Sequence, residues 1–200
     1  HAAEIYIERW GLTPQEEKSK VYIHPQHQDD VFINDDIAKV PAKEIPNHDL
    51  LVGGFPCQNY SVASLLRDAK GLIGEKGILW WEIERILNKL KDKNRAPDYL
   101  LLENVNKLLI SPTKRPGEQD FAGKDFAIIL SSLARLDYNV EWRMINAADY
   151  GFPQKRRRVF IFGFKESSKI SKTLKKHRLD EILYHHGVIA KSFPCISKNI

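Results

Sequence analysis

The sequence contains little cysteine and no long apolar run. Cys57 and Cys195 are the two cysteines of the 200 residues, and they lie far apart in the chain. Neither a CxxC pair nor a Cys/His spacing typical of zinc is present, so the sequence indicates no disulfide framework and no metal site. Scarce cysteine favours a reduced, cytoplasmic setting. No apolar run is long enough to cross a bilayer, which excludes a membrane-spanning helix.

Basic residues are concentrated near the carboxyl end of the chain. The formal net charge is +5, and residues 165–200 hold eight lysines and arginines against three acidic residues. The remaining 164 residues are electrically balanced. A polyanionic partner would explain this excess. A solvated basic linker explains it as well, and charge alone favours the linker.

Apolar runs alternate with helical patterns along the chain. This alternation predicts an α/β fold with a doubly wound, mostly parallel sheet. We expect helices over residues 2–10, 79–90 and 124–136, and strands over residues 31–33, 49–52, 99–102, 140–145 and 159–162. Ligands bind such sheets outside the carboxyl ends of the strands. The polar clusters that follow the strands are therefore the candidate functional residues.

The first cluster, Gly53-Gly54-Phe55-Pro56-Cys57-Gln58, follows the strand predicted over residues 49–52. Two glycines permit a tight turn, and proline stiffens the loop just before the thiol. A thiol held rigidly at the carboxyl end of a strand is well placed to act as a nucleophile. A small, buried, unreactive cysteine is the alternative interpretation, and this loop alone does not separate the two.

The second cluster, Glu103-Asn104-Val105, ends the apolar strand predicted over residues 99–102. A carboxylate at such a position is costly unless it is paired or protonated. Glu103 is therefore either an acid that serves chemistry or the partner of a structural arginine.

The third cluster, Gln154-Lys155-Arg156-Arg157-Arg158, precedes the last predicted strand. Strand alternation sends Arg156 and Arg158 to one face of the sheet and Arg157 to the other. A solvated basic turn is the alternative interpretation of this cluster.

In this order and spacing, the three clusters resemble the C5-cytosine DNA methyltransferase family, and most closely its bacterial restriction-modification members. The resemblance covers roughly residues 1–164 and implies the fold of S-adenosylmethionine-dependent methyltransferases. The family's glycine-rich cofactor loop and its target-recognition region are both missing from the match. We therefore expect a partial catalytic core over residues 1–166, followed over residues 167–200 by a basic linker and the start of the target-recognition region.

The resemblance implies methyl transfer from S-adenosylmethionine to C5 of a cytosine flipped out of duplex DNA, through a covalent bond between Cys57 and C6 of the base. It implies that Glu103 contacts N3 and the exocyclic amine of the base. Arg158 would contact the base carbonyl oxygen, and Arg156 would hold the loop and stabilise the thiolate. The resemblance assigns cofactor contacts to Asp36, Ile37, Gly54 and Pro56, and substrate or loop contacts to Gln58, Ser61, Asn104, Val105 and Gln154.

Two other functions stay open at this point. A tRNA cytosine methyltransferase shares the Pro-Cys-Gln and Glu-Asn-Val motifs, but it usually carries a Cys-Phe-Thr segment that this sequence lacks. A non-catalytic methyltransferase-like protein is the other alternative, and the intact Cys57, Glu103, Arg156 and Arg158 argue against it. The methyltransferase interpretation implies double-stranded DNA as partner, no metal, a monomer and a bacterial cytoplasm.

Overall fold

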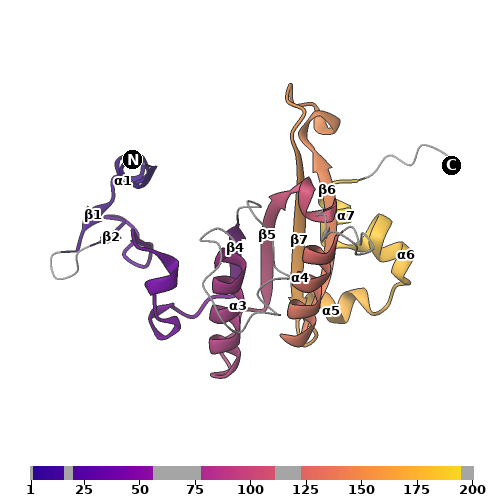
Figure 1. The fold of residues 1–200 in the computed structure, drawn as a ribbon, viewed down its shortest axis with the longest axis horizontal. Coiled ribbons are helices and arrows are strands. Elements are labelled where there is room, and N and C mark those ends of the chain that lie inside the picture. The colour runs from indigo at the N-terminus through magenta and orange to yellow at the C-terminus, as the bar shows by residue number, and fades with distance from the viewer. Residues whose placement is uncertain (1, 16–19, 56–77, 111–122, 195–200) are drawn as a thin grey trace, which may run out of the picture. The chain divides into compact units, whose positions relative to one another are not determined.

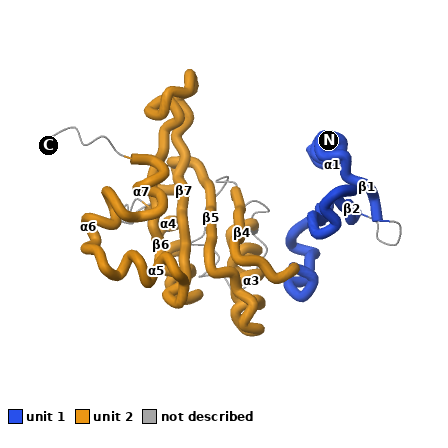
Figure 2. The backbone as a smooth tube through the Cα atoms, turned by 180° about the vertical axis from the view of Figure 1, so that it is seen from behind, with its two compact units in different colours: residues 1–45 blue, residues 46–200 orange. Residues whose placement is uncertain are grey.

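The computed structural model describes residues 2–15, 20–55, 78–110 and 123–194. The chain divides into two compact units, residues 1–45 and residues 46–200 (Figure 2). We describe each unit by itself.

The first unit consists of one helix and a small antiparallel sheet. Helix α1 spans Ala2–Trp10, and the sheet has the order β1-β2-β3, with strands Thr13–Pro14, Val21–Ile23 and Val31–Ile33. Two 3-10 turns follow, η1 at Ile37–Lys39 and η2 at Ala42–Glu44. The predictions of the helix over residues 2–10 and of the strand over residues 31–33 are confirmed. Strands β1 and β2 were not predicted from the sequence.

The second unit is built on a four-stranded sheet with the order β4-β5-β7-β6 (Figure 1). Its strands are β4 (Leu50–Gly54), β5 (Tyr99–Val105), β6 (Tyr138–Asn146) and β7 (Arg157–Lys165). Strands β4 and β5 pair in parallel, whereas β7 pairs antiparallel with both β5 and β6. The expectation of a mostly parallel sheet is therefore corrected to a mixed sheet. The reason lies in residues 147–156: a parallel neighbour needs a crossover of about a dozen residues or more, and this connection from β6 to β7 is shorter.

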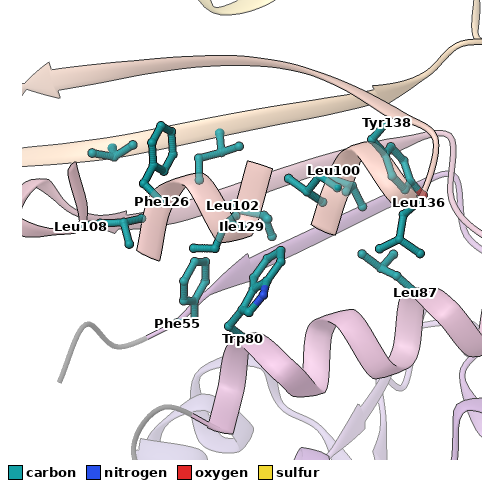
Figure 3. Packing of buried hydrophobic residues seen from close by; sticks show 13 residues of the cluster. Phe55, Trp80, Leu87, Leu100, Leu102, Leu108, Phe126, Ile129, Leu136 and Tyr138 are labelled. Atoms are coloured by element: carbon teal, nitrogen blue, oxygen red, sulfur yellow. The ribbon is translucent and has the colours of Figure 1, made fainter. Parts of the chain in front are cut away.

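One face of this sheet is covered by helices α3 (Ile78–Lys91) and α4 (Lys124–Arg135). Both helices carry apolar residues at helical spacing, so the predictions over residues 79–90 and 124–136 are confirmed. Their buried side chains Trp80, Leu87, Ile129 and Leu133 pack with Leu100 and Leu102 of β5. Figure 3 shows Trp80 beside Phe55, which follows the end of β4. This core holds the carboxyl end of β4 in place.

The opposite face is covered by chain that follows β7. Helices α5 (Lys169–Leu174), α6 (Leu179–Glu181) and α7 (Val188–Ser192) and the π-helical turn η5 (Ile182–His186) form this layer. Leu174 and Ile189 are buried against Ile145, Phe162 and Phe164 of the sheet. Residues 169–192 therefore fold onto the sheet, because apolar side chains recur among their exposed lysines. The assignment of residues 167–200 to a basic linker and the start of a target-recognition region stays a prediction. None of the helices in the described ranges is long and apolar enough to cross a bilayer.

Candidate functional site

Strand register brings residues of all three predicted clusters together at one edge of the sheet. Gly54 of β4 pairs with Glu103 of β5, and Val105 pairs with Arg158 of β7. The carboxyl ends of β4, β5 and β6 therefore meet the amino end of β7 at this edge. The connection from β6 to β7, which carries Arg156, extends beyond the end of β5 (Figure 1).

Glu103 and Arg158 form an ion pair at this edge. The Glu103 Oε1 atom lies 2.7 Å from Arg158 Nε, and the two side chains are 38% and 23% exposed. Arg158 also donates a hydrogen bond through Nη1 to the carbonyl oxygen of Arg157, at 2.8 Å. Two contacts thus orient the guanidinium, and the guanidinium in turn holds the Glu103 carboxylate. Both interpretations of Glu103 that the sequence left open, an arginine's partner and a group available for chemistry, are compatible with this partly exposed pair.

Gly54 leaves room for the Glu103 carboxylate. A Cβ placed on Gly54 would lie 3.4 Å from Glu103 Oε2, and among the described residues no other heavy atom lies within 4 Å of that position apart from Gly54 and its chain neighbours. The absence of a side chain at Gly54 therefore keeps the space above the end of β4 open beside the carboxylate. This is the kind of close approach for which glycine is suited.

Asn104 points to the opposite face of β5 and connects it to the end of β4. Its side chain is 1% exposed, and its Nδ2 atom donates to the carbonyl oxygen of Phe55 at 2.8 Å. Its Oδ1 atom accepts the N–H of Val105, also at 2.8 Å. The Phe55 ring is buried against Trp80, with ring centroids 5.6 Å apart. The residue that precedes Pro56 and Cys57 is therefore fixed through both its backbone and its side chain.

Four predicted site residues lie outside the described residues: Pro56, Cys57, Gln58 and Ser61. Their predicted roles stay predictions. What the structure describes is the position from which their loop starts, at the carboxyl end of β4 next to Glu103.

The basic cluster lines a polar hollow of about 480 Å³. Gln154 and Arg156 are both exposed, and the Arg156 carbonyl oxygen accepts the N–H of Ala147 at 3.0 Å, which closes the connection onto the end of β6. The hollow is lined by Asn106, Asn146, Gln154, Lys155, Arg156, Arg157 and Arg158. Four adjacent cationic side chains make this surface suited to a phosphate backbone.

A second, largely apolar hollow of about 240 Å³ lies beside the ion pair. Glu103, Arg156 and Arg158 contribute its charged groups. Its apolar lining comes from Ile145, Ala147, Tyr150, Phe152, Phe160 and Phe193. As strand alternation predicted, Arg156 and Arg158 share this hollow, whereas Arg157 does not line it. These aromatic residues were not predicted as site residues, because an aromatic side chain in a strand or turn is typical of the hydrophobic core.

Two predicted cofactor residues, Asp36 and Ile37, belong to the first unit. Asp36 is the N-cap of η1, and its Oδ1 atom accepts the N–H of Ala38 at 3.0 Å. Asp35 accepts a hydrogen bond from Lys20 Nζ at 2.9 Å. That bond, together with the N–H of Asp36, holds the pKa of the Asp35 carboxyl below its ordinary value. Gly54 lies in the second unit.

Comparison with known proteins gives the family of this chain. Residues 12–196 match the family model of the C-5 cytosine-specific DNA methylases. The type II methyltransferase M.Sau3AI of Staphylococcus aureus is 50% identical over 166 residues, which cover 82% of this chain and 38% of that protein. M.SsoII of Shigella sonnei is 39% identical over 80% of this chain and 36% of that protein. M1.ScrFI of Lactococcus lactis subsp. cremoris is 40% identical over 66% and 30%, respectively.

Among solved structures, the S. pombe Dnmt2 methyltransferase matches with a TM-score of 0.49 and 17% identity, over 76% of this chain and 40% of that chain. The chain spans less than two fifths of the length of the three curated relatives named above. The family match itself covers nearly the whole chain, including the described residues of all three clusters at the sheet edge. The chain belongs to the C-5 cytosine-specific DNA methylase family.

Proposed function

We propose that the protein containing this chain transfers a methyl group from S-adenosylmethionine to C5 of a cytosine in double-stranded DNA, as the modification enzyme of a restriction-modification system. The observation that carries the proposal is the Glu103–Arg158 ion pair, which lies where β4 leads into Pro56 and Cys57. A hollow of about 240 Å³ adjoins that pair and is large enough for a single base. Membership of the family supports the same reaction.

The chemistry requires a group that activates the base. C5 of cytosine is a poor nucleophile and is stacked inside the duplex, so the base must first leave the helix. The Cys57 thiolate then adds to C6, and Glu103 donates a proton to N3 as the ring gains electron density. C5 thereby becomes the nucleophilic carbon of an enamine. Loss of the C5 proton after methylation returns the electron pair that expels the thiolate, and N3 gives its proton back to Glu103.

When bound, S-adenosylmethionine supplies the methyl group as an electrophile on a sulfonium sulfur. In the second unit, Gly54 and Pro56 would contact the bound cofactor. The open space above Gly54 fits a ligand beside the Glu103 carboxylate, because a side chain there would fill it. This cofactor assignment is part of the proposal.

Arg158 has two roles in the proposed site. It orients Glu103 through the 2.7 Å contact, and it offers N–H donors to the carbonyl oxygen of the base. Arg156 lines both hollows, so it can serve the base on one side and the DNA backbone on the other. Phosphate contacts by the basic cluster would bind duplexes in a salt-dependent way and without sequence preference.

The experiment that tests the proposed function is covalent trapping. A duplex carrying 5-fluorocytosine at the target position cannot lose fluorine as a proton, so the bond to the enzyme should persist. With S-adenosylmethionine present, the wild-type protein should form a DNA adduct that mass spectrometry of a tryptic digest places on Cys57. Cys57→Ser should abolish both the adduct and methylation, whereas Cys195→Ser, the matched control, should retain both. No adduct with the wild-type protein, or an undiminished adduct with Cys57→Ser, would refute the proposal.

A further inference from the structure

The hollow beside the Glu103–Arg158 pair has an aromatic wall that comes from outside the sheet. Phe193 follows helix α7, and its ring lies nearly parallel to that of Phe160 on β7, with centroids 6.2 Å apart and an interplanar angle of 15°. Its ring also meets Tyr150 edge-on, at 5.4 Å and 84°. All three rings line the hollow. Phe193 is thus part of an ordered aromatic cluster.

Two charged residues of β6 hold this wall in position. Arg143 donates hydrogen bonds to the carbonyl oxygens of Phe193 and Leu183, the former at 2.5 Å. Glu141 is buried, with 4% exposure, and accepts the N–H groups of Ile189 at 3.1 Å and Ala190 at 2.9 Å. Both ends of the α7 segment are therefore bonded to β6.

The contents of the hollow define the ligand that fits it. Carboxylate and guanidinium groups lie together at one part of its wall, and apolar or aromatic side chains form the rest. Such a lining suits a flat ring with hydrogen-bonding atoms along one edge. A pyrimidine base has this shape and this distribution of polar atoms, and aromatic side chains stack on bases whatever their sequence context.

We infer that Phe193 is a stacking wall for the target base, and that Arg143 and Glu141 are positioning residues that act through it. The inference rests on the proposed function and deepens it by naming a substrate-contacting residue outside the motifs that the sequence singled out. Phe193 would hold the extrahelical cytosine flat while Glu103 and Arg158 engage its polar edge. The Phe193 ring would stabilise the flipped base, whereas phosphate contacts set most of the affinity for the duplex.

The test uses four variants of a methylation-competent protein that contains this chain: Phe193→Leu, Phe193→Tyr, Arg143→Met and, as control, Tyr184→Ala. Phe193→Leu keeps apolar packing but removes the flat ring, and Phe193→Tyr keeps the ring. Tyr184 is another aromatic residue of the same layer, 61% exposed and absent from the lining of the hollow. Each variant is assayed for single-turnover methylation, for duplex Kd and for the fluorescence of 2-aminopurine placed at the target position, which rises when the base leaves the stack.

Phe193→Leu should lower the methylation rate by roughly five- to a hundredfold, the range expected when base stacking is lost. It should also reduce the 2-aminopurine signal, while the duplex Kd stays within about threefold, because phosphate contacts are intact. Tyr184→Ala should behave as the wild type does, and Phe193→Tyr, which keeps the flat ring, should retain more of the methylation rate and of the 2-aminopurine signal than Phe193→Leu. Arg143→Met should reproduce a part of the Phe193→Leu defect.

Two outcomes would overturn the inference. If Phe193→Leu methylates and flips the base as the wild type does, the ring only fills space. If it loses duplex affinity in proportion to rate, Phe193 serves DNA docking and not the base. In both of these outcomes, normal methylation by the wild-type protein would leave the proposed function unaffected. Absence of methylation by the wild-type protein would refute the proposed function itself.

Discussion

The side-chain amide of Asn104 donates a 2.8 Å hydrogen bond to the backbone carbonyl of Phe55. This bond joins the buried face of β5 to the residue that leads into Pro56 and Cys57. Since Asn104 Oδ1 also accepts the N–H of Val105, both polar atoms of the Asn104 side chain have a hydrogen-bond partner. The second cluster of the sequence therefore physically anchors the first.

Asn104→Ala should destabilise the protein by about 1–3 kcal/mol, because it leaves the Phe55 carbonyl without this donor in a buried place. Asn104→Asp should be worse, since it sets a carboxylate oxygen against a carbonyl oxygen. Methylation should fall by more than the loss of folded protein explains, because the Cys57 loop loses its anchor. Urea unfolding and single-turnover rates would measure the two effects. Asn88 carries an exposed side-chain amide on α3, so Asn88→Ala should change neither the stability nor the methylation rate. Equal effects of Asn88→Ala and Asn104→Ala would contradict the anchoring role of Asn104.

Glu103→Gln should reduce methylation by about a hundredfold or more while duplex binding persists. The amide keeps the shape of the carboxyl group but cannot supply the proton, and general acid catalysis contributes on the order of 10²–10⁴. Arg158→Lys should also be impaired, because a lysine ammonium lacks the planar fork that bonds Glu103. Single-turnover kinetics alongside anisotropy titration would separate rate from binding. Asp180→Asn and Arg178→Lys, in the exposed ion pair of Arg178 with Asp180, are the matched controls, and equally slow control variants would argue against a specific role.

Gly187→Ala and Glu141→Gln should produce the same defect in the docking of α7. A Cβ on Gly187 would lie 2.3 Å from Glu141 Oε1, so the carboxylate would have to leave the N–H groups of Ile189 and Ala190. Glu141→Gln removes one acceptor and introduces a donor that faces a donor. A lost buried hydrogen bond costs about 1–3 kcal/mol, and each kcal/mol lowers Tm by roughly 2–4 °C for a protein of this size. Calorimetry would measure the Tm of each single variant and of the double variant. A Tm loss in the double variant equal to the sum of the two single losses would contradict a shared cause.

Glu166 should make stability depend on acidic pH. Hydrogen bonds from Lys175, Asn139 and Ser171, that from Lys175 being the strongest, lower the pKa of the Glu166 carboxyl below its ordinary value of 4.5. Its stabilising contribution is therefore present above pH 4.5 and is lost as the pH falls through the lowered pKa of the folded state.

The Tm difference between the wild type and Glu166→Gln should shrink from neutral pH towards pH of about 3, the acidic range in which carboxylates protonate. Calorimetry of both proteins in a pH series would measure this difference. A Tm difference that stays constant or widens on acidification would contradict the prediction.

Individual helices and strands could be predicted from the sequence because each depends on the spacing of apolar residues within one segment. Helical spacing of apolar residues identified α1, α3 and α4, and continuous or alternating apolar runs identified the strands of the larger sheet. The clusters around Gly54, Glu103 and Arg158 were recognisable for a similar reason: each places unusual residue types directly after or before a strand.

The tertiary structure decided what pairs with what. The antiparallel insertion of β7 between β5 and β6 sets Arg158 beside Val105 and so within reach of Glu103, and no local spacing encodes that register. The wall formed by Phe193 depends on long-range bonds from Arg143 and Glu141, far away in the chain. Local periodicity reports only which side of an element is apolar. Partners distant in sequence are selected by the packing of whole elements, in which burial and hydrogen bonding must be satisfied together.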